Sequence, residues 1–180
     1  RILLLLGFAV SAWCGITPLW TWKIIDSVSH PPSRFTQGLF WKNGELWECT
    51  GLSGKSAVYR SRGGQTLDSL HIAPPHFGEG CVDHRGLLLL LTWQSRFGFV
   101  FDLGSLKVQG TFPIRGEGWG ITRLGDTLWM SNGSHYLYRL DPSRFVPVDS
   151  IAVHDQGRRV TRLNELEVIN GWILANVWMS

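Results

Sequence analysis

The feature that most constrains the fold is an internal repeat of a short motif. Each copy carries Gln or Glu at the same place, and the four copies are FTQGL at 35–39, FGEGC at 77–81, GEGWGI at 116–121 and LNELEV at 163–168. The aligned polar residues, Gln37, Glu79, Glu117 and Glu165, are 42, 38 and 48 residues apart. A four-stranded blade of a β-propeller takes ~40 to 50 residues, so the spacing predicts one motif per blade.

Short segments typical of strands follow each motif. A turn and a second strand follow in NGELWECTG, HRGLLLLLTW, LGDTLWMSNG and NGWILANVW, and third strands follow in SAVYR, FGFVFD and HYLYRLDP. Glycine provides 21 of 180 residues, and charged residues make up 17% against a typical ~25%. This composition excludes disorder and coiled coil and favours compact, turn-rich β structure. We therefore predict an all-β chain with the fold of a β-propeller.

The number of repeats is small for a closed ring of roughly four to eight blades. The 146 residues from Phe35 to Ser180 correspond to about three and a half blades at about 42 residues each. The sequence stops in the fourth unit, directly after its second strand. We expect a truncated propeller that forms an open arc, with Trp22 to Ser29 as a candidate outer strand of the last blade.

The N-terminal segment has the pattern of a secretory leader. Arg1 precedes a nine-residue apolar run from Ile2 to Val10, which is too short to cross a bilayer, and small residues follow, with a cleavage position after Ala12. We predict a leader or hydrophobic anchor over residues 1–22, a propeller domain over 23–180 and an exported, periplasmic or secreted, protein. No other membrane contact is expected. The alternative for the apolar run is a buried strand.

Charge, histidine and cysteine patterns narrow the range of partners. The formal net charge is +3, and basic residues are scattered singly apart from Arg158 and Arg159, so nucleic acid is not expected as a partner. The six histidines lack the close spacing of a zinc helix, and we expect no metal and no cofactor. Cys49 and Cys81 can pair in an oxidising compartment or remain two buried thiols.

The repeated polar position predicts a site near the mouth of the channel. Gln37, Glu79, Glu117 and Glu165 would lie at equivalent points on the innermost strands, beside glycines that let these strands approach closely. Aromatic residues cluster in or just after the motifs: Phe35, Phe77, Trp93, Trp119 and Trp178. A carboxyl group walled by indoles would have a raised pKa, which suits acid/base chemistry. The alternative is that the motif is propeller architecture alone.

Nine segments in a fixed order resemble a known family. From Ser33 to Ser180 the chain is similar to the plant- and bacterial-type glutaminyl cyclotransferases in FTQGL, LWECTGLSGKS, FGEG, LTW, FVFD, GEGWGIT, LWMSNGS, LNELE and ANVW. The resemblance implies a five-bladed propeller. It also implies conversion of the N-terminal glutamine of a peptide or protein substrate into pyroglutamate with release of ammonia, without zinc.

The resemblance also implies roles for individual residues. Glu79 in FGEG would be the catalytic acid/base, and the substrate pocket would consist of Phe35, Gln37, Phe77, Trp93, Trp119, Asn164 and Trp178. Four further residues are expected to support the pocket or to join strands: Glu48, Glu117, Glu165 and Asn176. The family also supplies a lysine from its last blade, which this sequence lacks, so we expect weak catalysis from the chain as it stands.

These residue types suit an intramolecular cyclisation. Glu79 can take a proton from the attacking amine and return it to the departing ammonia, and Gln37 and Asn164 can donate hydrogen bonds to the amide oxygen. Two other functions stay open at this point. One is a non-catalytic propeller that binds peptides or glycans over its tryptophan-lined face, and the other is a metal-dependent propeller hydrolase.

Overall fold

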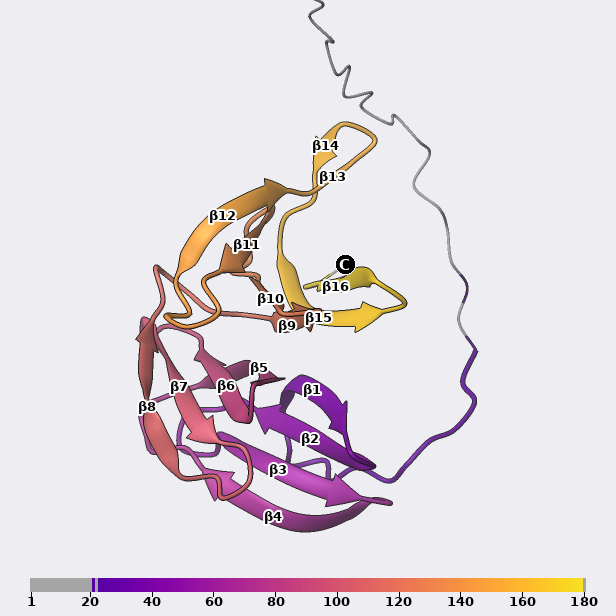
Figure 1. The fold of residues 1–180 in the computed structure, drawn as a ribbon. Coiled ribbons are helices and arrows are strands. Elements are labelled where there is room, and N and C mark those ends of the chain that lie inside the picture. The colour runs from indigo at the N-terminus through magenta and orange to yellow at the C-terminus, as the bar shows by residue number, and fades with distance from the viewer. Residues whose placement is uncertain (1–20, 22, 180) are drawn as a thin grey trace, which may run out of the picture.

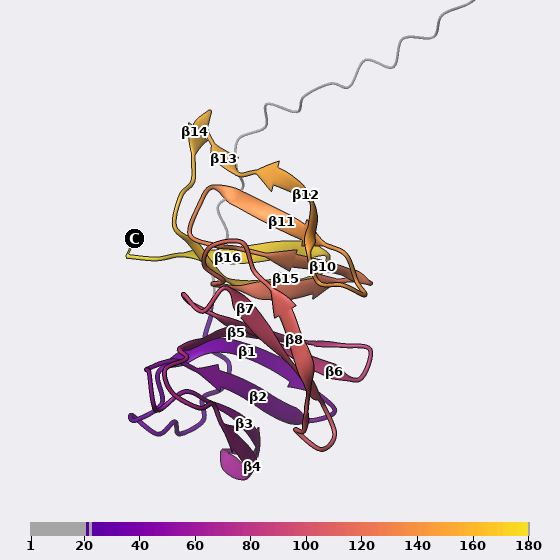
Figure 2. The same cartoon turned by 90° about the vertical axis from the view of Figure 1, so that its left-hand side faces the viewer.

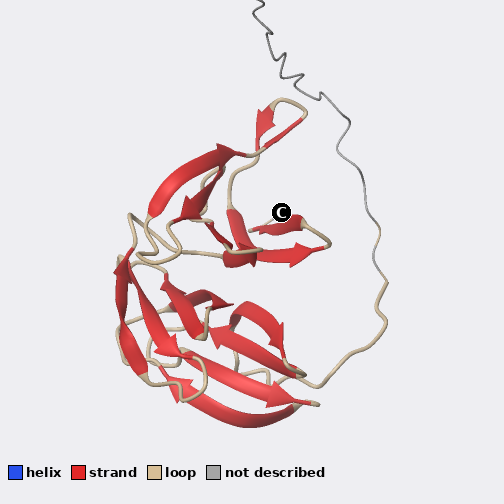
Figure 3. Ribbon diagram, in the orientation of Figure 1, coloured by secondary structure: helices blue, strands red, loops and turns tan. Residues whose placement is uncertain are grey.

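The computed structural model describes residue 21 and residues 23–179, and its secondary structure is entirely β (Figure 3). No helix occurs among these residues, so none of them forms a membrane-spanning helix. The predicted leader over residues 1–22 lies outside the described residues apart from Thr21. The prediction of an all-β chain is confirmed.

Within the described part of the chain, sixteen strands form three four-stranded antiparallel sheets and two hairpins that follow one another around an arc (Figure 1). The first sheet contains β1 (Thr36–Lys42), β2 (Glu45–Thr50), β3 (Ala57–Arg62) and β4 (Gln65–His71). The second contains β5 (Gly78–His84), β6 (Leu87–Thr92), β7 (Phe97–Asp102) and β8 (Val108–Pro113). The third contains β9 (Ile121–Leu124), β10 (Thr127–Met130), β11 (Tyr136–Leu140) and β12 (Pro147–Ala152).

The last two hairpins are β13 (His154–Asp155) with β14 (Arg158–Arg159), and β15 (Leu163–Ile169) with β16 (Trp172–Val177). Each of the three sheets has its strands in sequence order, as a propeller blade requires. The β15–β16 hairpin follows as the start of a fourth blade (Figure 1). The expected outer strand from Trp22 to Ser29 is absent, because residues 23–29 have no strand and lie exposed.

Two-residue turns join the first and second strands of the blades. Asn43 and Gly44 both have positive φ, at 53° and 78°, and Asn170 and Gly171 repeat this pattern at 51° and 81°. Two successive residues with positive φ define a type I′ turn, whose twist matches that of the flanking strands. The Asn-Gly pairs at 43–44 and 170–171 therefore fix where the first and last of these hairpins reverse, and Arg85-Gly86, with φ of 48° and 81°, makes the same kind of turn in the second blade.

The leucine run of β6 shows how the blades pack together. Leu88 and Leu90 lie in one buried cluster with residues of the first blade, while Leu89 and Leu91 lie in another with residues of the third. Successive side chains of a strand point to opposite faces, so a strand buried on both faces is apolar at every position. The middle blade is therefore a layer between two cores, which explains five consecutive leucines.

A disulfide between Cys49 on β2 and Cys81 on β5 links the first two blades. The sequence left this pairing open, and the structure decides it in favour of a bond. Lys42 and Asp83 add an ion pair between the same two blades. The inner strands that carry Gln37 and Glu79 are therefore joined covalently as well as by packing.

Candidate active site

The first strand of each blade, β1, β5, β9 or β15, is its inner strand. Three of these four inner strands have a bulge near their start. The pairing register shifts between Thr36 and Gly38 on β1, between Gly78 and Cys81 on β5, and between Leu163 and Leu166 on β15. In each strand one residue directly follows the first of the two positions between which the register shifts. These residues are Gln37 on β1, Glu79 on β5 and Asn164 on β15. A bulge bends the strand and turns a side chain away from the regular alternation, so these three polar groups are aimed alike, toward the axis.

Close backbone contacts identify the equivalent residue of the third blade. A Cβ on Gly38 would lie 2.6 Å from the backbone nitrogen of Cys81, and one on Gly80 would lie 2.7 Å from the backbone oxygen of Trp119. A Cβ on Gly120 would lie 2.8 Å from the Cα of Glu165. Gly38, Gly80 and Gly120 thus form one series, and the residue before each is Gln37, Glu79 or Trp119.

The predicted equivalence of Gln37 and Glu79 with Glu117 and Glu165 is therefore wrong. Trp119 and Asn164 occupy those points, two residues after Glu117 and one before Glu165. The sequence comparison aligned acidic side chains, whereas the inner strands are aligned by the glycines that allow their backbones to touch. Glu117 lies in the segment before β9 and not on a strand.

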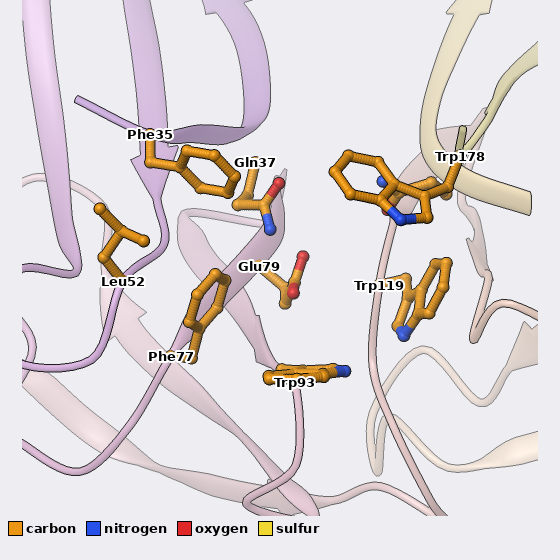
Figure 4. Close-up of a pocket in the computed structure, with 9 residues that line it drawn as sticks. Phe35, Gln37, Leu52, Phe77, Glu79, Trp93, Trp119 and Trp178 are labelled. Carbon is orange, nitrogen blue, oxygen red and sulfur yellow. The ribbon is translucent and has the colours of Figure 1, made fainter. Parts of the chain in front are cut away.

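The bulged residues open into a pocket of about 260 Å³. Its lining comprises Phe35, Gln37, Leu52, Phe77, Glu79, Trp93, Trp119, Asn164 and Trp178 (Figure 4). These are the predicted catalytic residue and all seven predicted substrate-binding residues, with Leu52 in addition. In Figure 4 the Glu79 carboxyl points into the pocket between the Gln37 amide and the indoles of Trp93 and Trp119.

Burial sets the acidity of Glu79, which is only 5% exposed. Loss of hydration raises the pKa of Glu79 to about 8, because water no longer stabilises the carboxylate. A hydrogen bond with Gln37 opposes this shift, and the negative charge of Glu117 adds to it. A carboxyl group with this pKa exists in both protonation states near neutral pH, as a proton shuttle requires.

Glu117 holds two of the pocket indoles. Its Oε2 accepts hydrogen bonds from Nε1 of Trp93 at 2.9 Å and from Nε1 of Trp119 at 2.8 Å. Its Oε1 accepts a hydrogen bond from the side chain of Gln94 at 3.2 Å. One carboxylate therefore fixes the orientation of two rings that line the pocket from different blades, which agrees with the supporting role expected for Glu117.

Small residues behind the pocket leave room for the aromatic rings. A Cβ on Gly51 would meet the ring of Phe77, and one on Gly133 would lie 2.7 Å from the ring of Trp119. The hydroxyl of buried Ser131 accepts a hydrogen bond from the Gly120 nitrogen at 2.8 Å and donates to the backbone oxygen of Asn164 at 2.7 Å. The third and fourth inner strands are tied at the pocket in this way.

Glu165 on β15 and Glu48 on β2 accept hydrogen bonds from neighbouring segments. Glu165 Oε1 accepts a hydrogen bond from the Leu39 nitrogen at 3.4 Å, while its Oε2 has no partner in the described part of the chain. Burial, followed by the charge of Glu167, raises the pKa of Glu165 well above its usual range. Glu48 is buried on β2 and accepts hydrogen bonds from Arg34 and from Thr36, which anchors the segment before β1.

The structure differs from the sequence prediction at two residues, Asn176 and Leu52. Asn176 lies exposed on β16 and does not line the pocket, so the structure gives no support for a role there. Leu52 lines the pocket but was not predicted. Its φ of 74° is unusual for a leucine and holds its side chain at the rim. The signal in the sequence was its place within LWECTGLSGKS, where the leucine follows Gly51 at the end of a predicted strand.

Among the described residues, no three His, Cys, Asp or Glu side chains converge as metal ligands do. The polar groups that face the pocket are one carboxyl and two amides, from Glu79, Gln37 and Asn164. Amides can donate hydrogen bonds to a developing negative charge, and the carboxyl can move a proton. The remaining lining is aromatic and aliphatic, which suits a flat, uncharged group such as a side-chain amide.

Fold and site together define a β-propeller whose pocket presents one buried carboxyl group of raised pKa among amides and indoles. Within that class, the family model for glutamine cyclotransferase matches residues 3–180. The chain therefore belongs to the glutamine cyclotransferase family.

Individual relatives agree with this assignment. A glutaminyl-peptide cyclotransferase of Arabidopsis thaliana is 38% identical over 162 residues, which are 88% of this chain and 51% of that protein. The chain thus spans about half the length of this curated relative. The crystal structure of Myxococcus xanthus glutaminyl cyclase matches with a TM-score of 0.79 and 30% identity, covering 88% of this chain and 68% of that one.

More distant structures share the fold alone. The WD40 domain of Neurospora crassa Pan2 matches with a TM-score of 0.58 at 12% identity, over 78% of this chain and 46% of that domain. BamB from Moraxella catarrhalis matches with a TM-score of 0.52 at 15% identity, over 82% and 45% of the two chains. Both likenesses agree with the predicted propeller.

Proposed function

We propose that this chain carries the catalytic pocket of a glutaminyl-peptide cyclotransferase, which converts an N-terminal glutamine into pyroglutamate and releases ammonia. The observation that carries the proposal is the Glu79 carboxyl, with a pKa of about 8, inside a pocket lined by amides and indoles. Family membership and the Arabidopsis relative support the same activity.

The reaction joins two ends of one residue. The α-amino nitrogen attacks the carbon of the side-chain amide, a new C–N bond closes the five-membered ring, and the bond to the amide nitrogen breaks. Because both groups belong to the same residue, the protein needs to supply the folded conformation rather than to bring two molecules together. Trp93, Trp119 and Trp178 provide flat apolar walls against which the folded glutamine packs.

Glu79 moves the proton in this proposal. As a carboxylate it accepts a proton from the attacking amine, and as an acid it returns that proton to the departing ammonia, so no proton is gained or lost overall. An N-terminal amine has a pKa of ~7.7 to 8.0. The Glu79 pKa of about 8 is close to this value, so transfer in either direction costs little free energy.

Asn164 and Gln37 stabilise the amide oxygen. Negative charge develops on this oxygen as the ring closes, and amide N–H groups in a buried site are effective donors to such a charge. Gln37 also bonds to Glu79, so it couples the acid/base group to the carbonyl of the substrate. Asn164 is 8% exposed, and its backbone is held by Ser131, which favours a fixed orientation.

A peptide assay tests the function. The chain is incubated with a peptide that begins with Gln, and pyroglutamyl product and ammonia are measured with and without chelator. We expect equal amounts of both products and no effect of the chelator. An N-acetylated peptide lacks the nucleophilic amine and should give neither product.

The same assay separates the alternatives. Saturable peptide binding without any product would instead indicate a propeller that only binds peptides. Release of ammonia without pyroglutamyl product, abolished by chelator, would indicate a metal-dependent hydrolase.

The compartment is a second, separate proposal. We propose that the protein is exported, because the Cys49–Cys81 disulfide is typical of an oxidising environment. The leader predicted over residues 1–22 supports the same conclusion. Fractionation of cells that express the chain with its first 22 residues, compared with a chain without them, tests export directly. Equal distribution of both chains would contradict it.

A further inference from the structure

A second recess with a basic lining lies next to the pocket. Its volume is about 510 Å³. It is lined by Asp155, Gln156, Arg158, Arg159, Val160, Thr161, Arg162 and Val177. Most of this lining belongs to the β13–β14 hairpin and to the segment that leads into β15. Figure 2 shows this hairpin projecting on the side of the propeller where β16 ends.

The recess and the pocket share a wall. Val177 lines the recess, and the next residue, Trp178, lines the pocket. The backbone nitrogen of Trp178 donates a hydrogen bond to the backbone oxygen of Arg162 at 2.9 Å. Neighbouring strands are ~4.8 Å apart and an extended chain advances ~3.3 Å per residue. The thickness of one chain segment therefore separates the two hollows, and an extended peptide spans that distance in about two residues.

The recess carries an excess of positive charge. Arg158 and Arg159 are exposed on β14, and no ion pair involves Arg159 or Arg162 within the described part of the chain. The rings of His135 and His154 lie nearby, with centroids 6.1 Å apart. Desolvation and the charges of Arg159 and His154 lower the pKa of His135, as expected where the local potential is positive.

The pocket has room for one residue of the substrate. Pockets for drug-sized ligands occupy ~300 to 1,000 Å³. At about 260 Å³, the pocket falls below this range, so the residues that follow the N-terminal glutamine must lie outside it. Their surroundings then decide which peptides bind well.

We propose that the basic recess binds acidic side chains at the third and fourth positions of a peptide whose N-terminal glutamine occupies the pocket. This inference rests on the proposed function and names a class of substrate for it, namely peptides with an acidic segment after the glutamine. Arginine binds carboxylates through two parallel N–H groups, so the side chains of Arg158, Arg159 and Arg162 suit this ligand.

Peptide binding tests the recess. The dissociation constants of the amidated peptides Gln-Ala-Glu-Glu and Gln-Ala-Gln-Gln are measured by calorimetry for the parent and for Arg158→Gln/Arg159→Gln. Exposed ion pairs contribute ~0.2 to 1 kcal/mol each. We therefore expect the parent to bind the acidic peptide about three- to tenfold more tightly, and the variant, which keeps Arg162, to lose most of this preference. The preference should shrink at 1 M salt, where the Debye length is ~3 Å.

A matched variant controls for net charge. Arg85→Gln/Arg144→Gln also removes two arginines, from turns between β5 and β6 and between β11 and β12, and should retain the preference. Equal binding of the two peptides by the parent, or a preference that is undiminished in Arg158→Gln/Arg159→Gln, overturns the proposal. A parent that prefers the acidic peptide but releases no ammonia from it contradicts the proposed cyclisation and leaves the recess assignment intact.

Discussion

The two halves of the pocket hold their side chains by different means. In the acid half, formed by the first two blades, Glu79 is buried and has a hydrogen bond with Gln37, and the Cys49–Cys81 disulfide links the supporting strands. In the indole half, formed by Trp93, Trp119 and Trp178, the rings are more exposed. Two of them are held by hydrogen bonds to the single carboxylate of Glu117.

The difference between the two halves shows how their surroundings give the carboxyl groups of Glu79 and Glu117 different properties. Glu79 has few donors around it, so burial raises its pKa to about 8 and it can exchange a proton near neutral pH. Glu117 faces three N–H donors and serves as a fixed acceptor. We infer that the acid half determines the rate of the chemical step, and that the indole half determines how well the substrate is bound.

The largest expected effect is on catalysis by the acid half. Glu79→Gln keeps the shape of the side chain and removes the proton shuttle, so kcat should fall ~10²- to 10⁴-fold with little change in KM. Steady-state kinetics with a Gln peptide measure both constants, and circular dichroism checks the fold. A folded variant with kcat within a few-fold of the parent would show that another group moves the proton.

The next effect concerns the stability of the acid half. Cys49→Ala/Cys81→Ala removes the covalent link between the first two blades, and the loss of a native disulfide costs ~2 to 4 kcal/mol of unfolding free energy. Urea denaturation of the parent and the variant, both under oxidising conditions, measures the difference. The parent in reductant is the control, and it should match the variant. Equal midpoints in oxidant would contradict the contribution of the disulfide.

A smaller effect is expected in the indole half. Glu117→Gln removes the charged acceptor of two indoles, and charge-assisted hydrogen bonds contribute ~1.5 to 3 kcal/mol when buried and less at an exposed site such as this. We expect KM to rise about three- to tenfold, while kcat stays within a few-fold. Because the Glu117 charge helps to raise the Glu79 pKa, the pH profile should also shift to lower pH. A change in kcat alone would contradict the division between the two halves.

The last effect is on the pH dependence of stability. The pKa of Glu79 is about 8 in the folded chain and has a reference value of 4.5, so the folded state binds more protons between these values. The free energy of unfolding should therefore decrease as pH rises from 4.5 to 8. Denaturation across this range should show a shallower decrease for Glu79→Gln than for the parent. Parallel curves would indicate an unperturbed Glu79.

The sequence predicts much of this structure because its signals are local. Repeat spacing predicts the blades, turn residues after each motif predict the hairpins, and the motifs together with the family resemblance predict the pocket residues from Phe35 to Trp178. The register of the third and fourth inner strands could not be predicted, because backbone contact at Gly80 and Gly120 decides it and a sequence shows no contacts. The role of Leu52 depends on a positive φ, which the residue type disfavours.

The pairing of Cys49 with Cys81 illustrates the same limit. Their separation of 32 residues is compatible with a bond or with two buried thiols, and only the approach of β2 to β5 decides between them. The basic recess also could not be predicted from the sequence. The sequence showed Arg158 and Arg159 as one adjacent pair, and the fold brings Val177 against the segment that carries them and Arg162.

The glycine contacts between inner strands also bear on the geometry of the whole ring. Each blade is a wedge, and its angle depends on how closely inner strands approach relative to outer ones. With Gly38, Gly80 and Gly120 in backbone contact, inner spacing is at its minimum and the wedge angle is large. Large wedges complete a circle with few members, so these three residues favour a propeller at the small end of the roughly four-to-eight-blade range. Substitution of any one by alanine would push neighbouring wedges apart and flatten the curvature of the ring.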